Sequence, residues 1–155
     1  MSTTKELLSN STDRLALRAR VMALTPDSQR QWGRMTVNQM LCHLNDSYVA
    51  MMDGRPVGSR VSFFNRTVVR WVAIHSGMTW PKGVKTMPAV DQLQGGTPPV
   101  GFEADRATLL ASMERFASKT ERDVHPHPIF GPLTTWEWQR WGWLHADHHL
   151  RQFGV

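Results

Sequence analysis

Apolar and polar positions recur at helical spacing over most of the chain. Leu8, Leu15 and Met22 lie seven residues apart within residues 4–24, which predicts an amphipathic helix over that range. Pro26 ends this pattern, because a proline disfavours the helical conformation in the residue before it. Beside these positions lie Leu7, Leu17 and Val21, so the helix is expected to be amphipathic.

A second helix is predicted from about residue 37 to residue 53. Thr36, followed three positions later by Gln39, has the form of a capping box, in which each side chain bonds the backbone N–H of the other residue. Gly54 is the residue type that most often ends a helix in the left-handed conformation. These two signals bound the helix at both ends.

Residues 60–76 form an apolar stretch that predicts a third, extra helix. Its β-branched residues, such as Val61 and Val68, would also suit a strand, but the length of the stretch favours a helix. Residues 77–101 follow with four prolines and five glycines, which indicates a long irregular loop. Loops of this length in compact domains are commonly lids or mobile segments.

Two further helices are predicted in the second half of the chain. Residues 102–119 carry a single apolar stripe, made of Leu109, Leu110, Met113, Phe116 and Ala117. Thr134 and Glu137 form a second capping box, so a last helix should follow and run to about Phe153. The pattern as a whole predicts an all-α fold: a four-helix bundle with an extra helix and a long loop between its second and third core helices. The length suits one domain, so residues 1–155 are expected to form a single helical domain.

Composition and charge narrow the class of protein. The chain has 41% hydrophobic and 20% charged residues, which is typical of a globular domain. A net charge of +5 is compatible with nucleic-acid binding, but the arginines are scattered and form no basic run, so a solvated basic surface is the better interpretation. The apolar runs are too short to span a bilayer and the N-terminus lacks the core of a signal peptide, so we expect a cytoplasmic protein without membrane contact.

A single cysteine, Cys42, rules out an internal disulfide and fits a reducing compartment. Cys42 precedes His43, but one helical step turns the two side chains about 100° apart. We therefore expect Cys42 to be a small buried apolar residue rather than a reactive thiol.

Histidines gather on one face of the last predicted helix, which also carries two tryptophans. His145 and His149 have the i, i+4 spacing by which two helical histidines can bind one metal ion, and His145 with His148 is a second chelating pair. The tryptophans turn this face toward the interior, where an imidazole without a partner is costly. A metal ion would satisfy one nitrogen of each ring; alternatively, the histidines bond one another and water.

A third ligand should come from another helix. His43, in the middle of the second predicted helix, is the best candidate, whereas His75, His125 and His127 lie at a helix end or in a proline-rich loop. Asp46 could orient a ligand ring, although a solvated side chain is the simpler expectation. Gln39 and Gln152 also share these faces, and neither they nor Asp46 is a clear general base.

Both histidine-bearing helices are apolar on a second side as well. Trp136, Trp143 and Leu150 recur every seven residues behind the last histidines, and Leu41, Tyr48 and Met52 lie behind His43. A helix with two apolar sides is central or covered by a partner. We expect either the extra helix and the loop or a homodimer to cover these sides.

The segments "MTVNQMLCHL" and "HADHHLRQFG" resemble those of the DinB-like superfamily of metalloenzymes, in a branch of unknown function. The resemblance covers most of the chain, with looser matches in "WPKGVKTMP" and "HPIFGPLTTWEW". It implies a four-helix up-and-down bundle that holds a divalent metal with one histidine from the second helix and an H-x-x-x-H pair from the fourth. Here these ligands would be His43, His145 and His149, which favours His149 over His148.

The resemblance implies a divalent-metal-dependent enzyme acting on a small molecule, either a hydrolase or a transferase that uses a low-molecular-weight thiol. Zinc suits three histidine ligands, and nickel, iron or manganese would also be accepted. The alternative is a non-enzymatic metal-binding or dimeric interaction module.

Overall fold

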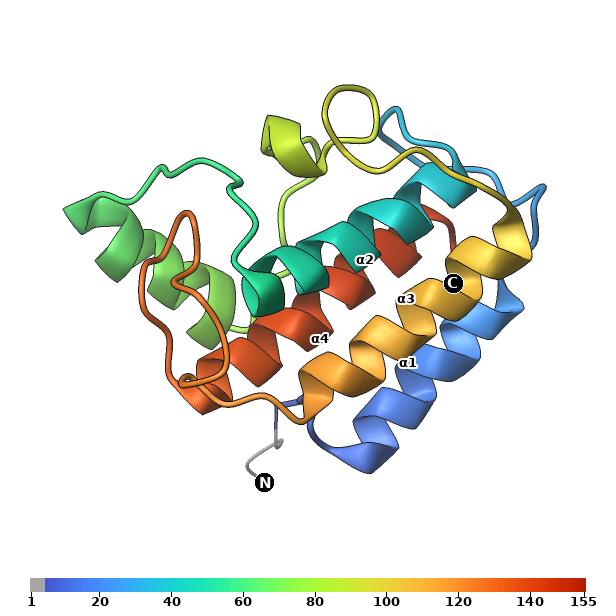
Figure 1. Cartoon of the computed structure of the whole chain (residues 1–155). Helices are drawn as coiled ribbons and strands as arrows, with labels where there is room; N and C mark the ends of the chain where they lie inside the picture. The colour runs from blue at the N-terminus through green and yellow to red at the C-terminus, as the bar shows by residue number, and fades with distance from the viewer. Residues whose placement is uncertain (1–4) are drawn as a thin grey trace.

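The computed structural model describes residues 5–155, and no strand occurs within that range. Its framework is four α-helices: α1 (Ser11–Ala23), α2 (Val37–Asp53), α3 (Phe102–Ala117) and α4 (Thr135–Gln152) (Figure 1). Three short helical segments, η1 (Asn65–Val69), η2 (Trp71–His75) and η3 (Pro88–Val90), lie between α2 and α3. The predicted all-α bundle is therefore confirmed.

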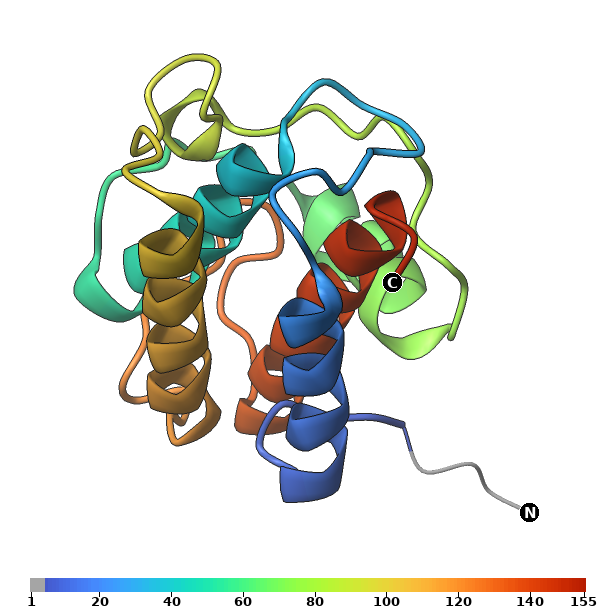
Figure 2. The same cartoon turned by 90° about the vertical axis from the view of Figure 1, so that its right-hand side faces the viewer.

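The four helices do not simply alternate in direction. Arg115 near the end of α3 pairs with Asp53 at the end of α2, so these helices are parallel. Arg20 near the end of α1 bonds Asp147 near the end of α4 at 2.8 Å, so these two are also parallel. The order is thus up, down, down, up (Figures 1 and 2). Residues 54–101 permit it, because this long connection returns the chain from the end of α2 to the start of α3.

The predicted capping boxes set the starts of α2 and α4. In each box the threonine side chain accepts from the N3 backbone and the N3 side chain accepts from the threonine backbone. Gly54 ends α2 with a φ of 70°, a conformation that favours glycine. The predicted range of 37–53 for α2 is confirmed, and α4 ends one residue before Phe153.

The first helix differs from its prediction. α1 begins at Ser11, where Asn10 caps it, while residue 4, the predicted start, lies outside the described residues. Leu15 and Met22 are 63% and 48% exposed, so these two heptad positions do not belong to the buried face, although the neighbouring positions of the predicted helix do. The buried helical side chains are Leu17 and Val21, four residues apart. Leu8 is buried, but it precedes the helix and therefore cannot set the helical stripe.

The extra helix over residues 60–76 is present in a different form. It consists mainly of two wide π-helical segments, η1 and η2, and stands to one side of the four-helix bundle (green in Figure 1). Within these two segments Ile74 alone is fully buried. The segment is therefore helical, as predicted, without being a core helix.

The second apolar sides of α2 and α4 are covered within the chain. α3 packs along α2, where Leu41, Tyr48 and Met52 are buried, and α1 packs on α4. The extra helix covers only one end of α4, where His75 stacks on Trp136. The expectation that the extra helix and the loop would cover both sides is corrected, because α3 and α1 also pack against these helices.

The side chains of all four α-helices contribute to one hydrophobic core. Asp105 and Ser112 of α3 are also buried. Asp105 accepts backbone hydrogen bonds from Val100 and Gly101, and Ser112 donates to the carbonyl of Leu109. None of the helices within residues 5–155 is both long and apolar enough to span a membrane.

Candidate metal centre

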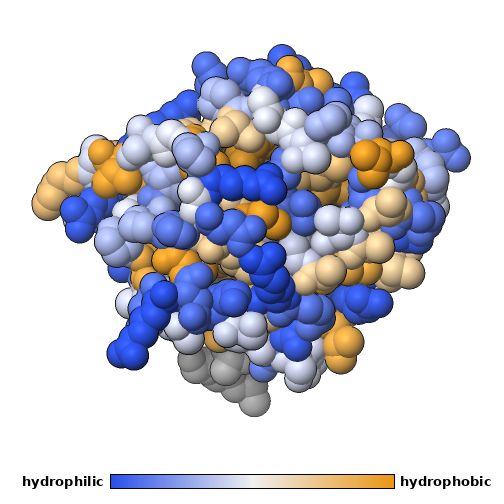
Figure 3. All heavy atoms as spheres, viewed as in Figure 1, coloured by the Kyte–Doolittle hydropathy of each residue, from blue (hydrophilic) through white to orange (hydrophobic). Residues whose placement is uncertain are grey.

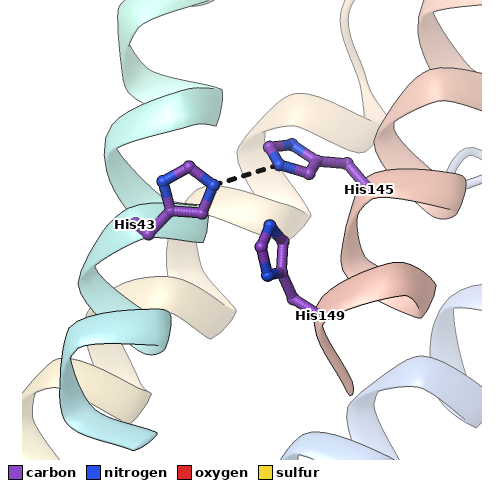
Figure 4. A group of neighbouring side chains, drawn as sticks. All are labelled: His43, His145 and His149. Atoms are coloured by element: carbon purple, nitrogen blue, oxygen red, sulfur yellow. Dashed lines mark hydrogen bonds between the residues drawn. The ribbon is translucent and has the colours of Figure 1, made fainter. Parts of the chain in front are cut away.

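Three histidines from two antiparallel helices meet beside the core (Figure 4). His43 lies in the middle of α2, and His145 and His149 lie one turn apart on α4. One ring nitrogen of each lies within 4.8 Å of the other two, and His43 Nε2 is 3.2 Å from His145 Nε2. Two Zn–N bonds of about 2.0–2.1 Å at a tetrahedral angle hold their nitrogens about 3.3 Å apart. The spacing of this histidine triad therefore suits one divalent ion.

A backbone carbonyl fixes the protonation of His43. Its Nδ1 lies 2.6 Å from the carbonyl oxygen of Val90, at the end of η3. Because a carbonyl can only accept a hydrogen bond, Nδ1 carries the proton and Nε2 keeps its lone pair. That lone pair faces His145, in the form required of a metal ligand.

A glutamine side chain does the same for His149. Nδ1 of His149 lies 2.9 Å from Oε1 of Gln152, whose Nε2 donates to the carbonyl of Trp32 at 2.8 Å. The bond to Trp32 fixes the orientation of the amide, so Oε1 must accept from Nδ1–H of His149. The other nitrogen, Nε2, is left unprotonated and points toward His43 and His145 in Figure 4.

His145 completes the triad with a less constrained ring. Its Nδ1 is buried and has no hydrogen-bond partner among residues 5–155, while its Nε2 faces His43. The three rings direct nitrogen lone pairs toward one point. The N–H groups of the same rings are too few to form hydrogen bonds with all of these lone pairs. A bound cation would resolve this imbalance, so the residues present fit a divalent metal.

Burial keeps the triad neutral. Removal from solvent lowers the pKa of His43, although the carbonyl of Val90 and the nearby carboxylates oppose this change. Burial lowers the pKa of His145 and His149 further, and the neighbouring histidines add to the effect. Neutral rings at neutral pH are what metal coordination requires, because a protonated imidazole cannot ligate.

The triad lies on the wall of a cavity of about 500 Å³, a size typical of small-molecule sites. Apolar side chains dominate the lining, among them Val69, Val72, Met78, Trp80, Val84, Met87, Ile129 and Trp141. Lys85 is the one Lys or Arg of the lining, and no carboxylate belongs to it within the described part of the chain. The cavity is thus suited to a largely apolar molecule that reaches the histidines at one wall.

The spacing on α4 allows two chelating pairs, and the structure brings only one of them together with His43. His145 and His149 group with His43, whereas His148 lies outside the triad, with its ring centroid 5.1 Å from that of His149. His148 instead packs at 5.9 Å from both Trp32 and Trp80. It lines the cavity next to the triad and could contact a bound molecule.

Asp46 neither orients a ligand ring nor lies in solvent. It is buried, and it accepts hydrogen bonds from the backbone and side chain of Thr97 at 2.7 and 2.8 Å and from Gln92 at 2.7 Å. It therefore anchors the loop of residues 77–101 to α2. Both sequence interpretations, an orienting carboxylate or a solvated side chain, are wrong. The ring of His43 is oriented by Val90 of the same loop.

The remaining candidates lie away from the triad. His75 contacts Glu137 at 2.9 Å, and His125 is exposed beside Gly54. Gln39 is used in the capping box of α2. Cys42 is buried as predicted, and burial, with the carboxylates of Asp105 and Asp46, raises the pKa of its thiol to about 12.

His127 is a cavity residue whose role sequence analysis missed. Its Nδ1 accepts from the backbone N–H groups of Ile129 and Phe130 at 3.1 and 3.2 Å, and burial lowers its pKa to about 3. The ring is therefore neutral, with its proton on Nε2, and it lines the cavity. The tight turn that closes at Gly131 produces this arrangement, which the spacing of residues in the loop does not reveal.

Comparisons with known proteins identify a family for this chain. No match was found among curated proteins or among solved structures. One family model, described as "Protein of unknown function (DUF1569)", matches residues 2–154. Because that match covers nearly the whole sequence, the chain belongs to the DUF1569 family.

Proposed function

We propose that this protein is a divalent-metal-dependent enzyme of the DinB-like superfamily that acts on a small molecule. The observation that carries the proposal is the histidine triad on the wall of the cavity. Val90 and Gln152 hold protons on the outer nitrogens of two rings, so the inner nitrogens are ready to coordinate. Such outer partners orient the rings of metal-binding histidines in many proteins.

The chemistry follows from what the cavity contains and lacks. A divalent ion held by three neutral imidazoles supplies Lewis acidity that can activate water or a thiol. No cysteine or carboxylate lines the cavity within residues 5–155, so neither group of the chain can act there as the nucleophile. Together with the resemblance to the DinB-like superfamily, this supports hydrolysis or transfer of a low-molecular-weight thiol to an electrophile as the reaction class.

The cavity residues would bind and orient the substrate. Apolar side chains contact its body and exclude water, Lys85 suits an anionic group, and Nε2–H of His127 is a donor for a substrate oxygen. Val90 and Gln152 keep His43 and His149 in the protonation state that their roles need.

A purely structural metal site fits less well. Structural zinc sites in proteins are usually closed by four protein ligands. The described residues supply three, and all three rings line the cavity. An open coordination position beside a small-molecule cavity favours catalysis over structure.

Elemental analysis of the purified protein tests the metal site. We expect about one divalent ion per chain, with zinc the best fit to three histidines. His43→Ala, His145→Ala and His149→Ala should each lose most of it. His125→Ala and His148→Ala are matched controls, because they remove an imidazole that lies outside the triad. Full occupancy in all three triad variants would contradict the proposal.

An activity screen tests the reaction class. The metal-loaded protein is incubated with apolar esters, amides and alkyl halides, with and without a low-molecular-weight thiol. Turnover that needs the thiol indicates a transferase, and turnover in its absence indicates a hydrolase. Metal binding without any turnover, together with a collapse of the melting temperature after chelation, would favour a structural role.

A further inference from the structure

An exposed apolar surface lies on the segment between α2 and η3. Six large side chains within residues 61–72 are 37–85% exposed: Val61, Phe63, Phe64, Val68, Trp71 and Val72. Met78 and Val84 extend this group, which we call the 61–84 surface. It holds eight of the thirteen large hydrophobic residues that are exposed in the described structure. At the left edge of Figure 3, on the side where the extra helix stands in Figure 1, hydrophobic atoms are exposed beside hydrophilic ones.

Such a surface is unusual for a protein that stays in water. Single exposed apolar residues are common, but a concentrated group of them marks an interaction site. Phe63 is 85% exposed and Phe64 is 59% exposed, so their rings contact little of the rest of the chain. The exposure is not a sign of a detached helix, because Arg70 makes two hydrogen bonds of 2.7 Å to the buried Glu137 on α4.

The same segment accounts for the positive charge of the protein. Residues 54–90 contain six of the eighteen Lys and Arg residues and none of the thirteen Asp and Glu residues. The rest of the chain has twelve basic and thirteen acidic residues, so the net charge of +5 originates here. The charge is therefore concentrated, although the basic residues form no run.

Two of these six cations are close to a carboxylate. Arg70 is paired with Glu137, and Arg55 lies 3.9 Å from Asp46. The other four, Arg60, Arg66, Lys82 and Lys85, are exposed and have no ion pair within residues 5–155. Lys82 lies over the ring of Trp32, with its Nζ 4.7 Å from the ring centroid.

We propose that the 61–84 surface docks the protein onto an anionic lipid membrane. Helical segments that combine exposed Phe, Trp and Val with Arg and Lys lie in the plane of a membrane interface, where their apolar side chains enter the acyl boundary and the cations contact anionic headgroups. The 61–84 surface has both components. Such docking is peripheral, and it departs from the expectation of no membrane contact, which the sequence supported only by its lack of a segment that could span a bilayer.

Charge argues against the other occupants. A two-fold dimer through this surface would bring two segments of net +6 together with no carboxylate of residues 54–90 to offset them. A nucleic acid would match the cations and could stack on the aromatic rings, but it would leave the aliphatic Val61, Val68 and Val72 exposed to water. An anionic bilayer satisfies the cations and the apolar side chains together.

The docking surface and the cavity share residues. Val72, Met78 and Val84 are exposed members of the 61–84 surface and also line the cavity that contains the histidine triad. Docking would therefore place the cavity wall at the lipid interface, where apolar small molecules concentrate. This consequence rests on the proposed function, whereas the docking itself does not.

Flotation of the full-length protein with lipid vesicles tests the proposal. The probes are vesicles of phosphatidylcholine alone and of phosphatidylcholine with about 30 mol% phosphatidylglycerol. We expect binding to the anionic vesicles that is at least tenfold tighter than to the neutral ones and is lost at about 0.5 M NaCl. Phe63→Ser/Phe64→Ser should lower the affinity more than tenfold. Arg60→Gln/Arg66→Gln should lower it about thirtyfold, at about fivefold per cation.

Matched control variants show whether a loss of vesicle binding is specific to the 61–84 surface. Leu15→Ser/Val100→Ser removes two apolar side chains that are 63% and 83% exposed elsewhere, and Arg18→Gln/Arg122→Gln removes two exposed cations outside the segment. Both should bind like the unaltered protein, and all four variants should melt at the same temperature as it does. Equal binding to neutral and anionic vesicles, or unchanged binding by Phe63→Ser/Phe64→Ser, would overturn the proposal.

Sedimentation of the protein without lipid tests the alternative that a second copy of the chain covers the surface. A protein that is dimeric at micromolar concentration, becomes monomeric in Phe63→Ser/Phe64→Ser and fails to bind vesicles would show that a second copy covers the surface. That outcome also overturns the proposal. Metal occupancy is measured in parallel, so failure of the docking and failure of the metal site are told apart.

Discussion

Two hydrogen bonds set the protonation of the histidine triad at the scale of single residues. The carbonyl of Val90 and the amide of Gln152 accept from Nδ1 of His43 and His149. Neither acceptor would ligate a metal, yet each decides which nitrogen of its histidine is free to do so. Gln152 depends in turn on the carbonyl of Trp32, so the loop before α2 also supports the site.

Gln152→Ala should therefore weaken zinc binding about 10- to 100-fold, as loss of an outer hydrogen-bond partner typically does. His149 would lose the acceptor that holds its proton on Nδ1. Competition titration against a chromophoric chelator measures the change. Gln29→Ala is the control, because that side chain bonds only the carbonyl of Asp27 on the surface. Equal zinc affinity in both variants would show that the hydrogen bond to Gln152 has no such role.

Glu137 joins separate elements of the fold. Its carboxylate completes the capping box of α4 and also accepts from Arg70 and His75 of the extra helix. Burial alone would raise its pKa, but the hydrogen bonds from Arg70, His75 and Thr134 lower the pKa of Glu137 to about 2. The extra helix, with its exposed 61–84 surface, is thus held to the bundle by a buried anion.

Glu137→Gln should lower the free energy of unfolding by about 2 kcal/mol at pH 7, because charged hydrogen bonds are lost. Since the pKa of Glu137 is lowered from a usual 4.5 to about 2, its ionised form contributes fully above about pH 4.5. The contribution disappears as the pH falls toward 2. Urea unfolding at pH 7 and pH 3 should show the difference between the two proteins shrinking. Exposed Glu121→Gln should give no difference at either pH, and a difference independent of pH would contradict the assignment.

At the scale of the whole molecule, several elements of the fold pack closely against α4 at Gly142. A Cβ atom there would lie 3.1 Å from Phe116 of α3 and 3.2 Å from Leu8. Tyr48 of α2 donates to the carbonyl of Gly142 at 2.6 Å. The segment before α1, together with α2 and α3, therefore approaches α4 at the one position of this contact that carries no side chain.

Gly142→Val should destabilise the protein by about 2–3 kcal/mol, because the added methyl groups overpack this crossing. Urea unfolding measures the loss. Ala111→Val makes a similar change at an exposed position of α3 and should cost less than about 1 kcal/mol. Equal stability of the two variants would show that the helices can separate at Gly142 without cost.

The sequence by itself determined the local features of this protein. Capping boxes at Thr36 and Thr134 act within one helical turn, so they placed the starts of α2 and α4 correctly. The i, i+4 spacing of His145 and His149 is equally local, and it put both rings on one face. Heptad spacing failed for α1 because Leu8 precedes the helix, so the pattern crossed an element boundary.

Only the tertiary structure decided which distant groups meet. Val90 lies 47 residues from His43, and Thr97 lies 51 residues from Asp46, so neither contact has a sequence signature. The parallel order of α2 and α3 and the exposure of the 61–84 surface likewise depend on which faces pack together. Helix formation is governed by neighbours three or four residues apart, whereas packing is chosen by the whole core at once.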